Sequence, residues 1–521
     1  MSEPVDDTEP DQPSPAVQAI RDAVLNAPRF QPVGEEPPAA DAPPGAERRR
    51  RPSIKLGLIG LAEECDLWHA ADGEVFVTFP FQGHAETWPL RAELFKDWLG
   101  ARAQEETGAV PTQSAISDVV RVLRMRALKG KAREPFRRTG QEGGRVFLDL
   151  CDADWRAVAI DVRGWQVLGA HGRPFIRSPS MLALPEPEGG GLVEELRRFV
   201  NVESDDDFVL VVAWLVAALR PRGPYPILVV NGEQGSGKSI FTRLIRSLVD
   251  PNAAPIRVAP RDERDLVVAA SNSHVLAIDN VSRIEPWLSD ALCRLATGGG
   301  FATRALHTDR DELVLTATRP IILNGIPMLT ERPDLADRAI TIRLRPFGSS
   351  ERRPEDTFLT EWEVSRPRIL GALCDAVSIA LRRLDEVHLL HLPRMADFAK
   401  WSVAAEPGFG CEAGGFLQAY ADNRRDVSDT TFEADQVAMA IHRLMAGAPE
   451  AGWEGSATEL LVQLNDLVPE AARRVRSWPL TAQALGNRLD RVAPLLRTRG
   501  VLIERRHSGI RTVVITRRRS A

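Results

Sequence analysis

The sequence predicts an α/β fold, on three observations around residues 225–325. An apolar run at 225–231, with the length and composition of a buried strand, leads into a glycine-rich turn. The turn is followed at 240–248 by apolar residues at helical spacing. Two further apolar runs, at 273–279 and 319–324, end in polar residues and are expected to be strands. A strand, a tight glycine turn and a helix in this order are typical of a phosphate-binding site.

The glycine-rich turn at 232–239 is a complete match to the phosphate-binding loop G-x-x-x-x-G-K-[ST]. Such a loop directs backbone N–H groups and the start of a helix at one anion. Lys238, one of only six lysines in the chain, is expected to reach the β- and γ-phosphates, and the Ser239 hydroxyl to bind Mg²⁺. We therefore predict a nucleoside triphosphate site with ATP and Mg²⁺ as cofactors. The residues expected to contact the nucleotide are Gly232, Glu233, Gln234, Gly235, Ser236, Gly237, Lys238 and Ser239.

Three polar residues downstream join Lys238 in the expected catalytic set. Asp279 ends an apolar strand, where a carboxylate can hold the water shell of Mg²⁺. Asn324 ends the next strand and is expected to sense the γ-phosphate or orient the attacking water, although a simple strand-end turn before Gly325 gives the same pattern. Arg338 suits a finger that reaches the γ-phosphate of a neighbouring protomer. Arg332 is the second choice for this role, and either arginine can instead pair with a nearby aspartate.

The order of these motifs resembles that of the superfamily 3 helicases, which are AAA+ ATPases of viruses, phages and mobile elements. The resemblance covers about residues 205–345 and includes the glycine-rich Thr-Arg segment at 295–307. It implies a hairpin that enters a central pore and holds single-stranded DNA, with Arg304 and His307 on it. A cation on a projecting turn can hold a backbone phosphate without reading sequence, although a solvated hairpin explains the same residues. Outside this block, the chain is similar to ATP-binding proteins of bacterial prophages and integrative elements.

One position departs from the pattern of this superfamily. Its helicases usually carry a second acid beside the metal-binding one, as a general base for the attacking water. Here that position is Asn280, which cannot accept the proton. Glu285 or Glu233 can take over this role; otherwise the protein hydrolyses ATP slowly and works as a nucleotide-gated clamp.

Composition places the chain among ordinary soluble globular proteins, with 44% hydrophobic and 26% charged residues. No apolar run reaches membrane-spanning length, and the acidic, proline-rich N-terminus does not resemble a signal peptide. The five cysteines are scattered without a C-x-x-C pair, which argues against zinc and for a reducing, cytoplasmic setting.

We predict five segments along the chain. A disordered acidic and proline-rich tail at 1–52 precedes an α+β domain at 53–187. The P-loop ATPase core of AAA+ type follows at 188–350, and a helical domain at 351–450. A basic, winged-helix-like domain occupies 451–521.

The last segment is strongly basic, although the whole chain has a net charge of -6. From residue 470 to the end, 13 arginines face three acids. A helix at 481–499 followed by a basic hairpin at 501–515 resembles a winged helix-turn-helix, whose helix enters the major groove while the wing lies along phosphates. The alternative is a winged helix that contacts protein. The residues expected to contact DNA here are Arg488, Arg491, Arg505, Arg506 and Arg511.

Together these features predict an ATP- and Mg²⁺-dependent DNA helicase or translocase that acts in replication or mobilisation of a phage-like element. We expect a homo-hexamer with single-stranded DNA in its pore and duplex DNA at the C-terminal module. The alternative, favoured by Asn280, is a DNA-bound switch or initiator that binds ATP with little hydrolysis or unwinding. A primase–helicase fusion is a third option, but the N-terminal domain shows no acidic triad or zinc knuckle for nucleotidyl transfer.

Overall fold

The computed structural model describes residues 54–169, 172–281, 284–304, 312–315, 318–325, 333–348, 353–449, 451–475, 478–508 and 510–517. The predicted tail at 1–52 and His307 lie outside these ranges. The backbone is described at Arg304 and Arg511, but their side chains are not.

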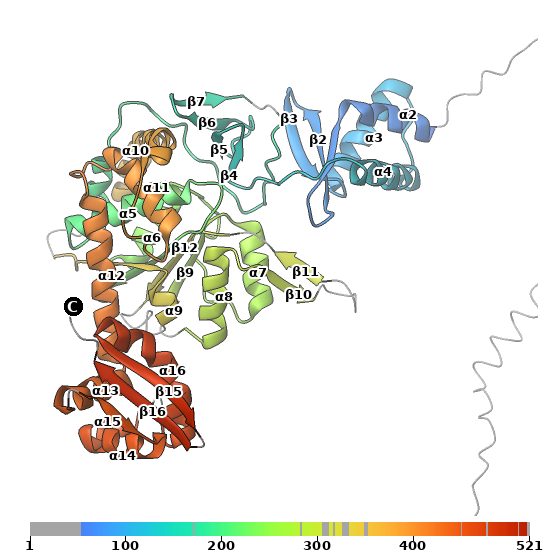
Figure 1. Ribbon diagram of the computed structural model, residues 1–521. Helices are drawn as coiled ribbons and strands as arrows, with labels where there is room; N and C mark the ends of the chain where they lie inside the picture. Colours follow the sequence, from blue (N-terminus) through green and yellow to red (C-terminus); the bar gives the residue numbers. More distant parts are fainter. Residues whose placement is uncertain are drawn as a thin grey trace, which may run out of the picture. The chain divides into compact units, whose positions relative to one another are not determined.

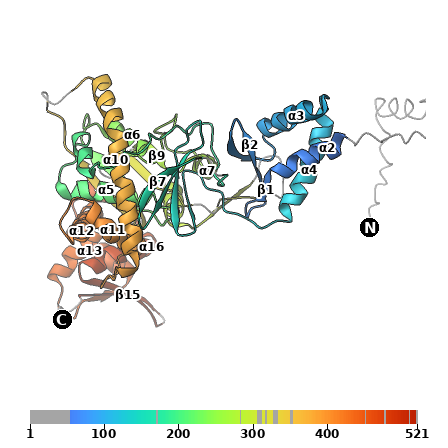
Figure 2. The ribbon, with the colours of Figure 1, turned by 90° about the horizontal axis from the view of Figure 1, so that it is seen from above.

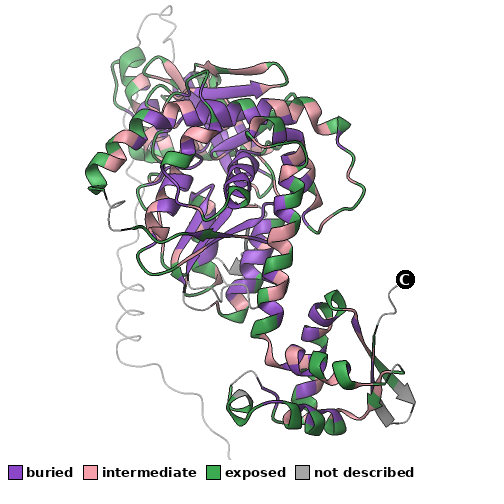
Figure 3. Cartoon of the chain, turned by 90° about the vertical axis from the view of Figure 1, so that its left-hand side faces the viewer, coloured by how far each residue is buried: buried purple, intermediate pink, exposed green. Residues whose placement is uncertain are grey.

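A four-stranded parallel sheet is the centre of the fold, with the strand order β13-β8-β12-β9. These strands are β8 (Ile227–Gly232), β9 (Leu276–Val281), β12 (Ile321–Gly325) and β13 (Ala339–Leu344). Their apolar residues are almost fully buried, as strands covered on both faces require (Figure 3). The mixed α/β prediction is confirmed. Because β12 lies between β8 and β9, any residue at its carboxyl end lies between the ends of those two strands.

Helices cover both faces of this sheet, because alternate residues of one strand point to opposite sides. Leu228 and Val230 of β8 pack with α5 (Asp205–Ala218) and α6 (Lys238–Ser247). Ile227 and Val229 pack with α7 (Glu263–Asn272), α8 (Pro286–Thr297) and the short α9 (Pro333–Ala336) (Figure 1). An antiparallel pair, β10 (Phe301–Arg304) and β11 (Glu312–Leu315), forms where the sequence predicted a hairpin.

The segment predicted to be helical contains α10 (Glu355–Arg383), α11 (Ala396–Ala405) and α12 (Gly415–Ala434). The long α10 (Figure 2) shares one hydrophobic core with α5 and the parallel sheet. Short 3₁₀ turns occur at Ala62–Glu64, Val193–Arg198, Leu384–Glu386 and Glu406–Gly408.

Residues 53–187, predicted as one domain, contribute to two main hydrophobic cores. The first unites α2 (Ile54–Leu61), α3 (Glu93–Thr107) and α4 (Gln113–Leu128) with the antiparallel sheet of β1 (Asp66–His69), β2 (Val75–Phe81) and β3 (His84–Pro89). The second sheet consists of β4 (Thr139–Glu142), β5 (Arg145–Asp149), β6 (Ala157–Asp161) and β7 (Gly164–Leu168). Its residues Leu148 and Ile160 belong to the same core as α5 and α10. This second sheet therefore packs as an extension of the region that follows it.

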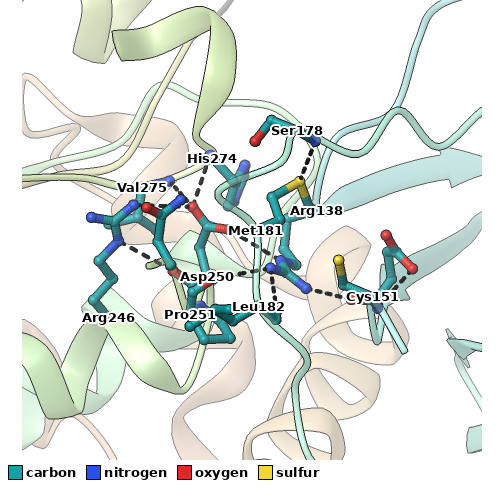
Figure 4. A network of polar contacts seen from close by, with 12 residues as sticks. Arg138, Cys151, Ser178, Met181, Leu182, Arg246, Asp250, Pro251, His274 and Val275 are labelled. Atoms are coloured by element: carbon teal, nitrogen blue, oxygen red, sulfur yellow. Dashed lines mark hydrogen bonds and ion pairs between the residues drawn. The ribbon is translucent and has the colours of Figure 1, made fainter. Parts of the chain in front are cut away.

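A buried ionic cluster joins the second sheet to the parallel sheet (Figure 4). Arg138, directly before β4, and Asp250, after α6, are both fully buried and form an ion pair at 3.1 Å. Asp250 also accepts hydrogen bonds from the backbone N–H groups of His274 and Val275, just before β9. Arg246 of α6 lies 3.7 Å from the same carboxylate. One carboxylate thus connects three parts of the fold.

The C-terminal region has its own core. It contains α13 (Gln436–Gly447), α14 (Ala457–Leu467), α15 (Glu470–Arg473) and α16 (Ala482–Thr498). Its three-stranded sheet has the order β14-β16-β15, with β14 (Trp453–Gly455), β15 (Val501–Ser508) and β16 (Ile510–Arg517). Because α13 packs in this core, the module begins near Gln436, before the boundary predicted at 451. None of the helices that the structure describes is long and apolar enough to cross a membrane.

Candidate functional site

The loop at 232–239 joins the carboxyl end of β8 to α6, and its glycines are required by its geometry. Gly235 and Gly237 have φ values of 83° and 77°, in the left-handed region that glycine adopts without strain. At Gly232 a Cβ atom would lie 2.4 Å from the Ser236 hydroxyl oxygen and 3.1 Å from the Leu344 carbonyl oxygen, so a larger residue requires its neighbours to shift. The glycine pattern in the sequence therefore has a steric cause in the structure.

Lys238 is the first residue of α6, and its side chain folds back over the loop. Its Nζ donates hydrogen bonds of 2.8 Å to the carbonyl oxygens of Gly232 and Glu233. The Ser236 hydroxyl is fully buried and has no hydrogen-bond partner among the described atoms. A buried hydroxyl without a protein partner can bond to a ligand bound in this loop.

Ser239, Asp279 and Asn324, predicted from separate motifs, meet next to this loop. The Ser239 hydroxyl donates to Oδ2 of Asp279 at 2.8 Å, and Nδ2 of Asn324 donates to Oδ1 of Asp279 at 2.8 Å. A hydroxyl and a carboxylate in direct contact are oxygen ligands of the type that Mg²⁺ takes, together with waters and substrate phosphates. The residues present therefore fit a magnesium ion.

Asn324 is fully buried, and both ends of its amide have partners. Its Oδ1 accepts a hydrogen bond of 2.5 Å from the Thr242 hydroxyl of α6, while Nδ2 donates to Asp279. In this arrangement the amide orients the Asp279 carboxylate. A contact with the γ-phosphate, as the sequence analysis predicts, requires Asn324 to exchange one of these partners.

Asn280 has a φ of 55°, which is unusual for a residue other than glycine. Its backbone N–H donates to Oδ1 of Asp279 at 2.8 Å, and its side chain is exposed and lines the cleft described next. Backbone held in this region costs free energy, and such positions cluster at functional sites.

A cleft of about 1290 Å³ opens beside the loop. Its walls are the first turn of α5, the carboxyl ends of β8 and β13, and one side of α12. Two further buried polar atoms in this lining, Oδ1 of Asn231 and the Thr341 hydroxyl, have no hydrogen-bond partner among the described atoms. The cleft is large enough for a nucleotide, because ligand pockets typically measure about 300–1,000 Å³.

Charge is distributed unevenly around this cleft. The cations Lys238, Arg343 and Arg345 lie at the loop and at the end of β13. The walls formed by α12, and by α5 with the residues just before it, carry carboxylates. These acidic residues are Glu203, Asp206, Asp207, Asp422 and Asp426.

Asn201 is a site residue that the sequence analysis missed. Its Nδ2 donates to the carbonyl oxygen of Ser236 at 2.9 Å and to that of Arg345 at 2.6 Å. It thereby joins the 232–239 loop to the chain after β13. Asn201 lies in a short irregular segment before α5, where no motif or periodicity marks it.

Arg338 lies at the opposite end of the parallel strands from the loop. Its carbonyl oxygen accepts a hydrogen bond from Ile227, the first residue of β8, so it lies at the amino end of the strands. Its side chain donates to the carbonyl oxygen of Asp334 at 2.8 Å. Arg338 is not part of the cleft of its own chain, and its action on a neighbouring protomer stays a prediction. Arg332 lies outside the described residues.

The predicted DNA contacts of the C-terminal module differ in how far they are already paired. Arg488 forms an ion pair with Asp435 at 2.6 Å, and Arg505 one with Asp490 at 3.0 Å. Arg506 lies 3.6 Å from its neighbour Glu504, and its side chain is 58% exposed. Arg491 on α16 is exposed.

Asp207 gives the cleft a pH-dependent charge. Burial raises the pKa of this carboxyl from 3.8 to about 6, although the Ser204 hydroxyl and the Arg343 backbone favour its charged form. Because the folded-state pKa is raised, the stabilisation is present below about pH 4 and is lost as the pH rises through about 6. We expect Asp207→Asn to be more stable than the unmodified protein at pH 8, by up to about 3 kcal/mol. Urea unfolding between pH 4.5 and 8 measures this, and a stability difference that does not change with pH contradicts it.

Two family models match the chain. Residues 193–430 match the actinomycete integrative conjugative element replication protein, and residues 437–521 match the AICE RepA C-terminal domain. The boundary between the two matches coincides with the junction of α12 and α13.

Among solved structures, the chain aligns with an apo structure of the NrS-1 C-terminal region. The identity is 10% and the TM-score 0.39, over 89% of this chain and 98% of that one. It also aligns with the JCV helicase at 14% identity and a TM-score of 0.21, over 39% of this chain and 66% of that one. No curated protein matches the chain in sequence. The family matches thus make the chain, over residues 193–430 and 437–521, similar to a replication protein of a mobile genetic element.

Proposed function

We propose that the protein is an ATP- and Mg²⁺-dependent DNA helicase or translocase of the superfamily 3 type, which replicates or mobilises an integrative element. The observation that carries this proposal is the contact of Ser239, Asp279 and Asn324 beside the 232–239 loop. Ser239 lies 40 positions before Asp279 in the sequence and Asn324 lies 45 positions after it, yet both side chains bond to the Asp279 carboxylate. A site for a metal and a triphosphate requires such a meeting of distant segments. The match to replication proteins of integrative elements supports the biological setting.

The charges of the cleft support one orientation of the nucleotide. The acidic walls on α5 and α12 repel phosphates, while Lys238 and the N-terminus of α6 attract them. The triphosphate therefore lies at the loop. Ribose hydroxyls and base amines, which are donors, then face the carboxylates and the acceptor Oδ1 of Asn231.

The residues of the loop have separate roles in this proposal. Lys238 releases the carbonyl oxygens of Gly232 and Glu233 and donates to the β- and γ-phosphates instead. Ser239 and Asp279 would hold Mg²⁺, which would neutralise charge on the phosphates. Asn324 and Thr242 keep the Asp279 carboxylate in position.

Activation of the attacking water separates the motor from the alternative, a DNA-bound switch that binds ATP with little hydrolysis. Asn280 has no basic group, whereas Glu233 lines the cleft and Glu285 precedes the first turn of α8. Either glutamate can act as the general base for the attacking water if the protein is a motor. The strained backbone at Asn280 favours a functional role for that residue in both proposals.

Steady-state ATP hydrolysis with and without single-stranded DNA tests the motor directly. We expect DNA to stimulate turnover several-fold, and Asn280→Glu to raise the DNA-free rate at least about tenfold, because it adds a general base beside Asp279. The control is Asn280→Gln, which has the size of glutamate without a proton acceptor. An absence of stimulation together with an absence of strand displacement favours the switch.

Exposed arginines of the C-terminal module are expected to contribute to duplex binding. Arg491→Gln should weaken binding and lower the slope of log K against log salt by about 1, because one phosphate contact is lost. Arg488→Gln is the comparison: Arg488 already pairs with Asp435, so we expect its loss to affect stability more than the salt slope. Fluorescence anisotropy at several salt concentrations measures both. A slope that Arg491→Gln leaves unchanged removes this residue from the interface.

A further inference from the structure

One helix, α12, both lines the cleft and leads directly into the C-terminal module. Residues from Ala419 to Thr430 line the cleft. Asp435 ends α12 and also caps α13, because its carboxylate accepts the backbone N–H groups of Val437 and Ala438 at 3.0 and 3.1 Å. No linker separates the two helices, so a change in the position of α12 is passed to the module.

At the cleft, α12 is bound to the edge strand of the parallel sheet. Asn423 donates from Nδ2 to the carbonyl oxygen of Thr341 at 2.5 Å, and its Oδ1 accepts the N–H of the same residue at 3.1 Å. The amide thus pairs with β13 as a neighbouring strand would. The same edge continues to Arg345, which Asn201 joins to Ser236 in the loop. The Asn201 and Asn423 amides, together with the chain from Thr341 to Arg345, therefore connect the loop to α12.

A weak ion pair crosses from β13 to α12 within the cleft. Nη2 of Arg343 lies 3.8 Å from Oδ2 of Asp426, and the two side chains are 56% and 63% exposed. Such an exposed pair contributes little free energy and is easily exchanged. Because Arg343 and Asp426 both line the cleft, groups of a bound nucleotide compete with each of these side chains for the other. Occupancy of the cleft thus alters the attraction between the sheet and α12.

At the other end, α12 and its C-cap residue contact α16, the helix that carries Arg491, at two points. Asp429 of α12 pairs with Arg499 at 2.6 Å, and the guanidinium of Arg499 lies 5.0 Å from the centre of the Phe432 ring. Asp435 pairs with Arg488 at 2.6 Å. Arg488 lies near the middle of α16 and Arg499 directly follows its last residue, so the C-terminal half of the helix is expected to follow α12 when α12 moves.

We propose that α12 couples the nucleotide cleft to the C-terminal module, so that nucleotide occupancy changes the affinity of the module for DNA. This inference rests on the proposed function, because it assumes both a nucleotide and a DNA ligand. By linkage, DNA bound to the module changes nucleotide affinity by the same factor.

The test uses the full chain, a fluorescein-labelled DNA duplex, and a non-hydrolysable ATP analogue with Mg²⁺. Calorimetry first measures binding of the analogue alone. Anisotropy then gives the Kd for DNA with and without saturating analogue, and the ratio of the two is the coupling. We expect a ratio of at least about fivefold in either direction for the unmodified protein, within the usual range of allosteric coupling.

Charge reversal at the junction distinguishes α12 from other routes. Asp429→Arg should bring the ratio close to one, because two positive charges then meet where the ion pair was. The double variant Asp429→Arg with Arg499→Asp should restore the ratio. The matched control is Glu433→Arg, the same change one helical turn later at an exposed residue, which should leave the ratio as it is. If thermal melting shows that Asp429→Arg does not fold, Asp429→Asn replaces it.

Each outcome has one meaning. If the analogue binds but the Kd for DNA is the same with and without it, the coupling is refuted and the proposed function stands. If Asp429→Arg keeps the ratio of the unmodified protein, coupling does not pass through α12 and the inference is also refuted. If calorimetry detects no binding of the analogue, it is the proposed function that fails.

Discussion

Replacing Lys238 with alanine is expected to weaken ATP binding by about 10- to 100-fold, which corresponds to the loss of charged hydrogen bonds worth roughly 1.5–3 kcal/mol. Lys238 Nζ is held 2.8 Å from two carbonyl oxygens of the loop, directly above the start of α6. A γ-phosphate at this position would replace the carbonyl oxygens as acceptor. Without the ammonium group, only backbone N–H groups and the helix N-terminus remain to bind the phosphates.

Calorimetry with Mg²⁺ and ATP measures this effect. Lys129→Ala is a suitable control. Lys129 is an exposed lysine at the end of α4, a helix that packs in a different hydrophobic core from the loop. We expect the control to bind ATP as the unmodified protein does. If Lys238→Ala binds ATP with unchanged affinity, the loop is not the phosphate site and the proposed function is wrong.

Replacing Asp250 with alanine is expected to lower the free energy of unfolding by about 3–5 kcal/mol, because it leaves buried guanidinium groups without a counter-charge. Asp250 is fully buried and lies 3.1 Å from Arg138 and 3.7 Å from Arg246. Burial opposes ionisation of Asp250, but the two arginines outweigh it, so the pKa of the carboxyl stays below its usual value. Two backbone N–H groups before β9 also lose their acceptor.

Guanidinium unfolding followed by tryptophan fluorescence measures the loss, with Asp385→Ala as the control. Asp385 is exposed, and its replacement should change the free energy of unfolding by less than about 0.5 kcal/mol. Asp250→Asn should fall between the two, because it keeps an acceptor for the backbone but loses the charge. An Asp250→Ala protein as stable as the control would show that the cluster does not hold the second sheet to the parallel sheet.

Local motifs in the sequence predicted the parts of the site that have a fixed spacing. The glycines, Lys238 and Ser239 follow from the loop pattern, and Asp279 and Asn324 follow from the polar ends of apolar strands. The structure brings Ser239, Asp279 and Asn324 together because β12 lies between β8 and β9. The strands themselves were predictable as short apolar runs bounded by turn residues.

Contacts between distant segments were not predictable in this way. Asn201 and Asn423 act through amides that bond to the backbone of other segments, and such partners leave no periodicity in the sequence. Arg488 and Arg505 were assigned to DNA by their charge, but Asp435 and Asp490 pair with them in the folded chain. The division of residues 53–187 between two cores was missed because alternating apolar residues reveal a strand but not the partner that covers it.

The position of Arg338 at the amino end of the parallel strands has a consequence for kinetics. An arginine at this position does not reach the cleft of its own chain. If Arg338 acts as a finger, each active site therefore contains residues from two protomers. Turnover per molecule should then fall on dilution, as protomers separate. Inactive Lys238→Ala and Arg338→Ala chains should regain part of the rate when mixed, since some interfaces then unite an intact loop with an intact finger.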